Sequence, residues 1–440
     1  MNAGEEMAGH GARVPIAVTG ATGYIGRVLV DALLRRGFEV RALGRRPPEP
    51  ARPGVRFFRY ATDDERIDPA ILAGARALVH LAWDTSGRDD GGAADVRAVA
   101  RLIDAASAAG VHLVFVSSQS ASRDAPTAYG RGKWQAEEMV LAAGHSVVRP
   151  GLVYGREERG LFGRLCSLAA TLPILPALWP EPKVQPVHVD DLCAALATIA
   201  TSAPAAQRAY CVATPEPVGF NHLMRAISVH WLGRPLRSIP VPARLLLAVA
   251  RAAQALGLPI QPSQLRSLFQ LPPIATRDDL QRIGVDLRSL ADGLRMPQRR
   301  RRRLLVREAA AMLRYLTRRP PSHCDIRRLA QHWMNEPDAA PLLLPRVVIA
   351  LPRLMGALVP PAGAPDPREQ VFRRRLMTAC CLAEASRDGF SRFGLVEDAA
   401  WPKAAVRIAA AVAEEAGLRL CALFLRRPAR RASSGPSDDA

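Results

Sequence analysis

The residues best suited to chemistry are a tyrosine and a lysine four positions apart, in the segment Tyr129-Gly-Arg-Gly-Lys133. On a helix this spacing places both side chains on one face. The Lys133 ammonium group can then favour the ionised form of the Tyr129 phenol and lower its pKa. Such a phenol can exchange a proton with a hydroxyl or carbonyl group near neutral pH. A chance spacing without chemical meaning is the alternative.

A glycine-rich turn near the start of the chain is a second candidate site. Residues 14–19 have the apolar composition of a buried strand, and the glycines Gly20, Gly23 and Gly26 follow it before a segment with helical spacing. Glycines at these points allow a tight turn and let a pyrophosphate approach the backbone. The helix N-terminus then offers amide donors to the phosphates. The segment predicts dinucleotide binding, with a purely structural turn as the alternative.

The end of the next apolar segment, residues 38–43, bears on the choice of dinucleotide. A carboxylate at this point accepts hydrogen bonds from the adenosine ribose of NAD. Here the segment continues into Gly44, Arg45 and Arg46 instead. Guanidinium groups suit a 2′-phosphate, so the sequence favours NADP(H) over NAD(H). A solvated arginine pair is the alternative.

Strand and helix patterns alternate through the first 150 residues. Further strands are expected at 55–60, 77–83 and 112–118, and helices at 69–72, at 93–109 and from Tyr129 onward. Alternation of this kind predicts an α/β fold, in which helices cover both faces of a doubly wound parallel sheet. Ligands of such folds bind at the carboxyl ends of the strands. Ser117 and Ser118 end one of these strands, just before Tyr129.

Six blocks together resemble the extended short-chain dehydrogenase/reductase family, which comprises NAD(P)-dependent nucleotide-sugar epimerases, dehydratases and reductases. The blocks are TGATGYIGR (19–27), HLAWD (80–84), VSSQS (116–120), YGRGK (129–133), RPGLVYG (149–155) and VQPVHVDDL (184–192). With a closing segment at 280–294, the resemblance covers about residues 13–296. It implies a Rossmann-type sheet with a small substrate region.

The resemblance also implies roles for individual residues. Tyr129 would be the catalytic acid/base, Lys133 would hold the nicotinamide ribose and lower the tyrosine pKa, and Ser118 would hydrogen-bond the reacting oxygen. Ser117 and Ser120 are alternatives to Ser118. The residues expected to bind the cofactor are Gly20, Thr22, Gly23, Tyr24, Ile25, Gly26, Arg45, Arg46, His80, Ala82, Lys133 and Pro150. A core position, without cofactor contact, is the alternative for His80.

Two departures from the family pattern bear on the reaction. Dehydratases of this family carry an Asp-Glu pair after the serine strand, where this chain has Gln119, Ser120 and Ala121. The stretch from Ser118 to Tyr129 is also shorter than in sugar epimerases. We therefore expect an NAD(P)-dependent oxidoreductase that transfers hydride between nicotinamide and a keto or hydroxyl group of a sugar nucleotide or other small carbonyl compound. An NAD-dependent nucleotide-sugar epimerase and a non-catalytic dinucleotide-binding or sensor module are the alternatives.

Charge and composition suggest how the 440 residues are organised. The net charge is +19, and residues 297–440 carry 26 basic and 14 acidic side chains of the totals of 60 and 41. We expect a disordered N-terminus at 1–12, the NAD(P)-binding domain at 13–296 with its substrate region at about 156–296, a basic helical domain at 297–427 and a disordered tail at 428–440. Helical stretches are expected at about 323–335, 369–386 and 403–425.

The run Arg299–Arg303 suggests partners for this basic region. A solvated linker, contact with an anionic membrane and contact with nucleic acid are the three interpretations, and nucleic acid is the least favoured because no recognition motif accompanies the run. The seven cysteines show no metal-ligand spacing, so no metal is expected. Without a signal peptide or spanning segment, we expect a cytoplasmic protein, in peripheral contact with the inner face of the membrane under the second interpretation. The family resemblance implies a homodimer.

Overall fold

The structure is a computed structural model, and the chain divides into two compact units, Met1–Arg295 and Met296–Ala440. The residues it describes are 14–47, 50–64, 67–84, 92–202, 208–234, 236–255, 262–317, 320–336, 340–358 and 367–385, with positions 413 and 417. The expected disordered ends and most of the expected helical stretch at 403–425 lie outside the described residues.

Twenty-five helices and strands are described in the first unit. They are β1 (Pro15–Thr19), α1 (Tyr24–Arg35), β2 (Glu39–Gly44), β3 (Val55–Arg59), η1 (Pro69–Ile71), β4 (Ala77–His80), α2 (Ala93–Ala108), β5 (His112–Val116), α3 (Ala128–Ala142), β6 (Ser146–Pro150), β7 (Leu152–Tyr154), α4 (Gly160–Thr171), β8 (Leu175–Trp179), β9 (Lys183–Val184), β10 (Pro186–His188), α5 (Val189–Thr201), β11 (Ala209–Val212), β12 (Val218–Gly219), α6 (Phe220–Ala226), η2 (Ile227–Trp231), β13 (Ser238–Pro242), α7 (Ala243–Ala255), α8 (Pro262–Phe269), α9 (Arg277–Ile283) and α10 (Leu290–Gly293).

Seven strands form the central sheet, in the order β11-β6-β5-β4-β1-β2-β3. Every pairing in this sheet is parallel. The chain moves outward from β1 to β3 and then returns to the other side of β1 as β4, so the strand order reverses between β1 and β4. In doubly wound sheets the ligand crevice lies at the carboxyl ends of the strands at this reversal. The predicted α/β class is confirmed.

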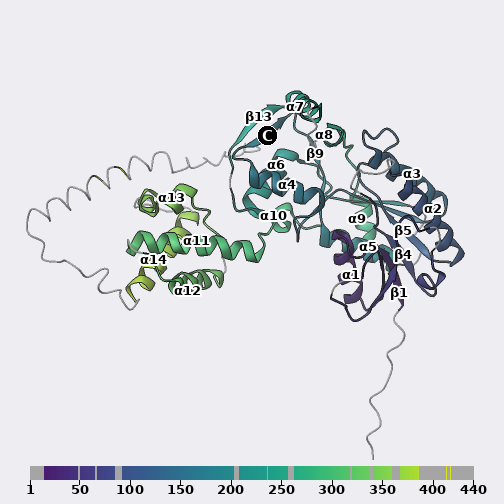
Figure 1. Ribbon diagram of the computed structural model, residues 1–440, viewed down its shortest axis with the longest axis horizontal. Helices are drawn as coiled ribbons and strands as arrows, with labels where there is room; N and C mark the ends of the chain where they lie inside the picture. Colours follow the sequence, from purple (N-terminus) through teal and green to yellow (C-terminus); the bar gives the residue numbers. More distant parts are fainter. Residues whose placement is uncertain are drawn as a thin grey trace, which may run out of the picture. The chain divides into compact units, whose positions relative to one another are not determined.

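Helices cover both faces of the sheet, because successive residues of its strands point to opposite sides. Ile16 and Val18 of β1 belong to a core shared with α1 and α5, whereas Ala17 belongs to a core shared with α2 and α3. Figure 1 shows these two helix pairs around the strands. Burial on both faces explains why the strands are almost continuously apolar in sequence.

Two predicted elements differ from those in the structure. The strand expected at 77–83 ends at His80, so that residues 81–83 form a loop at the carboxyl edge of the sheet. The helix expected at 69–72 is a single turn, η1, capped by the Asp68 side chain, which accepts a hydrogen bond from the backbone N–H of Ala70.

A smaller core lies in the region that follows β6. It is formed by apolar residues of β7, α4, β8, α6 and η2, among them Phe162, Leu165 and Trp231, together with Leu294. Short strand pairs, β7 with β10 and β8 with β13, hold this region together.

The second unit is helical within the described residues. Its elements are α11 (Gln298–Thr317), α12 (His323–Met334), α13 (Arg346–Ala350), η3 (Pro352–Leu358) and α14 (Pro367–Glu384). Arg299–Arg303 form the first turns of α11, just after the boundary between the two units. The core includes a buried ion pair, in which Arg375 lies 3.3 Å from Glu308. Glu308 also accepts backbone N–H groups of Leu342 and Leu343, which satisfies its second oxygen.

Candidate active site

The glycine-rich turn packs so closely that larger residues do not fit. Gly20 has a positive φ of 65°, and a Cβ atom there would lie 3.0 Å from the backbone nitrogen of Ala82. A Cβ atom on Gly26 would lie 2.1 Å from the carbonyl oxygen of Gly20. The turn is therefore pressed between β4 and α1, as a phosphate-binding turn requires.

The first turn of α1 is open to a ligand. Gly23 is the N-cap and has no side chain to accept the first backbone N–H groups of the helix, and Thr22 and Gly23 are exposed. Free amide donors at a helix N-terminus bind phosphate. The residues present therefore fit a dinucleotide pyrophosphate.

His80 lies behind this turn rather than in the lining of the site. Its side chain is fully buried, and its Nδ1 lies 2.7 Å from Thr19 Oγ1. Thr19 Oγ1 accepts the N–H groups of Leu81 and Ala82, so its own hydrogen goes to Nδ1. Burial lowers the pKa of His80 to about 3, so the ring is neutral. The ring occupies the core position that the sequence analysis gave as the alternative for His80, and together with Thr19 it holds the loop that carries Ala82.

Arg45 and Arg46 directly follow β2 at the carboxyl edge of the sheet. Both side chains are exposed, and neither forms an ion pair with a described residue. Gly44 is close to the phosphate turn, since a Cβ atom on it would lie 3.9 Å from Thr22 Oγ1. Two uncommitted guanidinium groups therefore lie next to the turn that the pyrophosphate would occupy.

Ser118 is the serine that influences Tyr129, because its side chain lowers the pKa of the phenol. The N–H groups of Ser117 and Gln119 bond to carbonyl oxygens of β6, so the backbone N–H of the intervening Ser118 points away from β6. Ser117 is buried and its hydroxyl has no partner among the described residues, whereas Ser120 Oγ lies 2.9 Å from Ser118 Oγ. The structure thus distinguishes Ser118 from Ser117 and Ser120, the two alternatives given in the sequence analysis.

Helix α3 presents Tyr129 in its first turn. Thr127 caps this helix by accepting the N–H of Gly130 at 3.1 Å. A Cβ atom on Gly130 would lie 2.6 Å from the carbonyl oxygen of Ser120. The absence of a side chain at this position lets α3 approach the loop after β5, which brings Tyr129 to Ser118.

Lys133 is buried on the same face of α3. Its Nζ donates a hydrogen bond to the carbonyl oxygen of Val116 at 2.8 Å and lies 4.0 Å from the centroid of the Trp83 ring and 4.6 Å from that of Phe115. Burial lowers the pKa of Lys133 to about 7, against the attraction of Asp95 and Glu137.

The expected lowering of the Tyr129 pKa by Lys133 is not found in this structure. Burial raises the pKa of Tyr129 to about 12, and the hydrogen bond with Ser118 only partly opposes this. Lys133 Nζ is 5.9 Å from the centre of the tyrosine ring and is directed to Val116. Its attraction is therefore weaker than the loss of solvent.

Trp83 and Asp95 are site residues that the sequence analysis missed. The Trp83 ring meets the Tyr129 ring edge-on, with centroids 6.3 Å apart. Asp95 is buried near the start of α2 and accepts the N–H of Asp84 at 3.0 Å. The signal for Trp83 is its place in the block HLAWD, directly after β4 at the carboxyl edge; Asp95 gives no comparable signal.

A buried amide pair stands where dehydratases carry acidic residues. Gln119 donates to Gln185 at 3.1 Å and to the carbonyl oxygen of Pro272 at 2.9 Å. Gln185 in turn accepts the N–H of Ile274 at 2.8 Å. Amides cannot deliver a proton to a leaving hydroxyl group. The Gln119–Gln185 pair therefore holds the backbone around Pro272 and Ile274 in place and does not supply an acid.

The remaining predicted cofactor residues have structural contacts. Tyr24 donates to the carbonyl oxygen of Gly155 at 2.6 Å, and burial raises its pKa above the usual range. Pro150 is buried at the end of β6 and accepts the N–H of Gln119. The Ile25 carbonyl oxygen accepts from the thiol of Cys193 at 3.5 Å.

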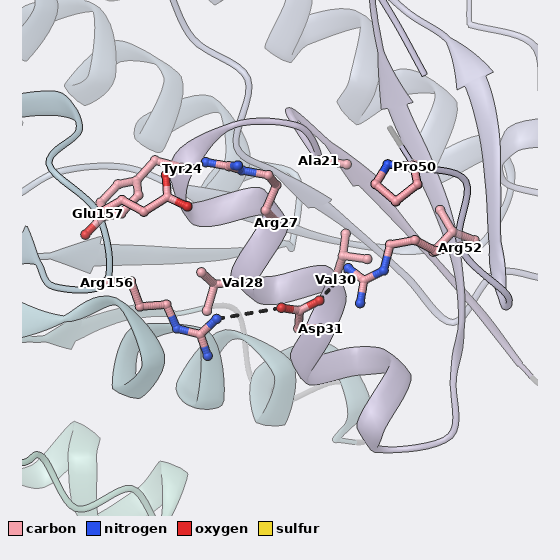
Figure 2. Close-up of a pocket in the computed structure, with 12 residues that line it drawn as sticks. Ala21, Tyr24, Arg27, Val28, Val30, Asp31, Pro50, Arg52, Arg156 and Glu157 are labelled. Carbon is pink, nitrogen blue, oxygen red and sulfur yellow. Dashed lines mark hydrogen bonds and ion pairs between the residues drawn. The ribbon is translucent and has the colours of Figure 1, made fainter. Parts of the chain in front are cut away.

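A cavity of about 400 Å³ lies along α1 (Figure 2). Ala21 and Tyr24 line one end, and Asp31 lies between Arg52 and Arg156 and contacts both. Ser118, Tyr129 and Lys133 do not line it. The cavity is therefore separate from the residues suited to proton transfer.

The model of the NAD dependent epimerase/dehydratase family matches residues 16–213. Residues 16–213 belong to that family. The match spans the glycine turn, Ser118, Tyr129 and Lys133, and the family uses a nicotinamide cofactor.

Among curated proteins, the epimerase/dehydratase-family segment is similar to ceramide reductase of Caulobacter vibrioides, with 35% identity over 194 residues. This alignment covers 42% of the chain and 60% of the reductase. An uncharacterized protein of Mycobacterium bovis, Mb2073c, is 30% identical over 247 residues, 54% of the chain and 25% of that protein. The chain thus spans less than two thirds of the length of these relatives.

Solved structures agree on the fold. The crystal structure of gox2253 superposes with a TM-score of 0.51 at 22% identity, covering 64% of the chain and 95% of that protein. The terminal R domain of the myxalamid PKS-NRPS biosynthetic pathway gives 0.51 at 18% identity, covering 65% of the chain and 89% of that domain. At these identities the likeness concerns the fold alone.

Proposed function

We propose that the first unit is an NADP(H)-linked oxidoreductase that transfers hydride between nicotinamide and a keto or hydroxyl carbon. The observation that carries this proposal is the placement of Tyr129 and Lys133 on one face of α3, with Trp83 against both and with Ser118 as the serine whose side chain lowers the pKa of the Tyr129 phenol. These groups lie beyond the carboxyl ends of β4 and β5, next to the glycine turn.

The state of Tyr129 favours reduction of a ketone. With a pKa near 12 the phenol is protonated at neutral pH and is ready to donate. In this direction Tyr129 gives its proton to the carbonyl oxygen while Ser118 holds that oxygen by a hydrogen bond. The reduced nicotinamide supplies the hydride when bound. Trp83 keeps water from Lys133 and Tyr129. This exclusion of water maintains the lowered pKa of Lys133 and the raised pKa of Tyr129.

The residues proposed to hold the cofactor follow from their positions. The N–H groups of Thr22 and of the first turn of α1 would bind the pyrophosphate, and Lys133 would bind the nicotinamide ribose. Arg45 and Arg46 would bind a 2′-phosphate, which is the basis of the preference for NADP(H). Ala82 would line the cofactor in the loop held by Thr19.

The substrate is proposed by class only. The amide pair Gln119–Gln185 leaves dehydration without an acid, which favours a reductase or dehydrogenase. The relative named ceramide reductase supports a reduction. A sugar nucleotide or another carbonyl compound fits the site, and the region after β6 would frame it.

The test combines binding with turnover. Fluorescence titration with NADPH and NADH should show binding to the wild type and to Tyr129→Phe, and NADPH oxidation should be followed with keto-sugars, simple ketones and a keto form of ceramide. Loss of turnover only in Tyr129→Phe is the expected result. Tyr60→Phe, a buried tyrosine of the core between the sheet and α2, is the matched control and should keep its activity.

Three other results would overturn the proposal. Absence of binding to either nucleotide would exclude a nicotinamide enzyme. Binding without turnover in the wild type would favour a sensor module, and interconversion of sugars without net use of NADPH would identify an epimerase.

Homodimer formation, a cytoplasmic location and membrane contact through residues 297–440 stay predictions. Among the described residues, no helix is both long enough and apolar enough to cross a bilayer.

A further inference from the structure

The cavity along α1 is lined by segments that are far apart in the sequence (Figure 2). Helix α1 forms one side, the chain before β3 contributes Pro50 and Arg52, and the chain after β7 contributes Arg156 and Glu157. The volume of about 400 Å³ lies within the range of about 300–1,000 Å³ that is usual for sites of small molecules. The cavity is therefore large enough for a small organic ligand.

One wall of the cavity is apolar. Val28 and Ala42 are buried in the core between α1 and the sheet, and Val55 packs against this core from the start of β3. Ala21 continues the wall into the glycine-rich turn. Such a wall favours the hydrocarbon part of a ligand over water, because contact removes the apolar surface of both from solvent.

Charged side chains also line the cavity, and arginines outnumber carboxylates among the described residues. The charged residues that line it are Arg27, Arg52, Arg156, Asp31 and Glu157. Asp31 forms ion pairs with both Arg52 and Arg156. Glu157 accepts hydrogen bonds from Arg27 at 2.8 Å and from Arg159 at 3.0 Å. Each carboxylate is thus shared by two guanidinium groups, so the described lining is positive and attracts an anion.

Arg27 has a hydrogen-bond donor without an acceptor. Its Nε atom is buried and has no hydrogen-bond partner among the described residues, although another nitrogen of the same guanidinium group donates to Glu157. Buried polar groups are normally hydrogen-bonded, so an exception calls for an explanation. Since Arg27 lines the cavity, an anionic ligand can supply the acceptor.

Arg156 is held at the cavity in an unusual backbone conformation. Its φ of 52° lies in the left-handed region, which is uncommon for residues other than glycine. Ion pairs with Asp31 and Asp190 fix its side chain, and the carbonyl oxygen of the preceding residue, Gly155, accepts the Tyr24 hydroxyl group at 2.6 Å. Such conformations persist only where the surrounding structure fixes them, and they are concentrated at functional sites such as ligand clamps.

We propose that this cavity binds a small organic anion with an apolar body, in which one carboxylate or phosphate group is attached to a short hydrocarbon chain. The charged group accepts a hydrogen bond from Arg27 Nε and is stabilised by the positive charges of Arg52 and Arg156. The hydrocarbon chain lies against Val28 and Val55. An inorganic anion and an uncharged alcohol each use only one of these two interactions.

The cavity differs from the proposed dinucleotide site. Thr22, Arg45 and Arg46 are not among the described residues that line it. The cavity extends along α1 from Tyr24 to Asp31, which lie about 10 Å apart at about 1.5 Å for each residue of the helix. The anion and a dinucleotide can therefore be bound together. Binding of the anion does not rest on the proposed function.

The test is isothermal titration calorimetry of the full chain with three probes, hexyl phosphate, hexanol and inorganic phosphate. Wild type should bind one hexyl phosphate for each chain. Hexanol lacks the anionic group and inorganic phosphate lacks the hydrocarbon chain, so each should bind at least about tenfold more weakly. Saturation with NADPH should change the affinity for hexyl phosphate by less than about threefold, because solvent and salt screen the charge of the dinucleotide.

Two variants change the two walls separately. Arg27→Gln removes the charged donor and should weaken binding of hexyl phosphate by about 10- to 100-fold. Val55→Phe fills part of the space for the hydrocarbon chain and should weaken binding by at least about tenfold. Circular dichroism checks that each variant is folded, and Val55→Leu, with a smaller expected loss, replaces Val55→Phe if that variant does not fold.

The matched control is Arg35→Gln. Arg35 is an exposed arginine of the same helix and is not among the described residues that line the cavity. This variant removes the same charge as Arg27→Gln and should bind hexyl phosphate like wild type.

Five results would overturn the proposal. Absence of hexyl phosphate binding would exclude the site, and equal binding of inorganic phosphate would show an adventitious ion only. Full competition by NADPH would place the probe in the dinucleotide site. Equal losses in the Arg27 and Arg35 variants would reveal a general effect of charge, and unchanged binding in the Arg27 and Val55 variants would place the probe elsewhere. Because hexyl phosphate binding requires neither turnover nor dinucleotide, failure of the proposed enzyme activity would leave these outcomes readable.

Discussion

The side-chain nitrogen of Lys133 lies 4.0 Å from the centre of the Trp83 ring. The tryptophan follows β4 and the lysine belongs to α3, so the contact joins two elements at the carboxyl edge of the sheet. The ring excludes water from an amine that already gives one hydrogen bond to the Val116 carbonyl oxygen. Burial lowers the pKa of Lys133 to about 7, which makes this residue sensitive to pH near neutrality.

Lys133 should make the stability of the first unit depend on pH. Its pKa is about 7 in the folded protein and near 10.4 in the unfolded chain, so the unfolded state binds more protons between these values. The free energy of unfolding should therefore rise with pH across this window. Urea unfolding without dinucleotide, at pH 7 and pH 9, measures the rise, which the variant Lys133→Met should lack. An equal rise in both proteins would contradict this.

Trp83→Ala should remove the cause of the lowered lysine pKa. Without the ring, water reaches the amine, and the pKa of Lys133 should move back toward its usual value. The increase in stability between pH 7 and pH 9 should then shrink in the same urea experiment. Trp83→Phe, which keeps an aromatic ring at this point, should retain more of it. If Trp83→Ala behaves like wild type, the ring does not control solvent access.

Arg45 and Arg46 should determine the choice between the two nicotinamide dinucleotides. A charge-assisted hydrogen bond is worth about 1.5–3 kcal/mol, so replacing either arginine with glutamate should weaken NADPH binding by about 10- to 100-fold. NADH, which lacks the 2′-phosphate, should bind with almost unchanged affinity. Fluorescence titration with NADPH and with NADH gives the ratio of the two affinities. Arg56→Glu, on the exposed side of β3, controls for the general loss of charge.

The buried pair in the second unit should be essential to its stability. Arg375→Met leaves the Glu308 carboxylate without its cation and should destabilise this unit by about 3–5 kcal/mol. The double variant Glu308→Gln/Arg375→Met removes the isolated charge and should recover part of that loss. Chemical denaturation followed by tryptophan fluorescence, to which the fully buried Trp333 of this unit contributes, measures the change. Equal stability of the single and double variants would show that the pair is not coupled.

The sequence by itself predicted the parts of the fold that depend on local pattern. Buried parallel strands must be apolar on both faces, so β1, β2 and β5 could be located from composition. The glycines of the phosphate turn were identifiable because a positive φ and close approach exclude other residues. The spacing of Tyr129 and Lys133 placed them on one helix face for the same local reason.

Only the tertiary structure decided which side chains meet and what burial does to them. It turned Ser118, and not Ser117, toward Tyr129; it buried His80 behind the turn and put Trp83 over Lys133. These contacts join residues from different strands and helices, and no local pattern records them. The pKa values of Tyr129 and Lys133 moved in the directions set by desolvation, which depends on all the surrounding atoms and not on the spacing of two residues along a helix.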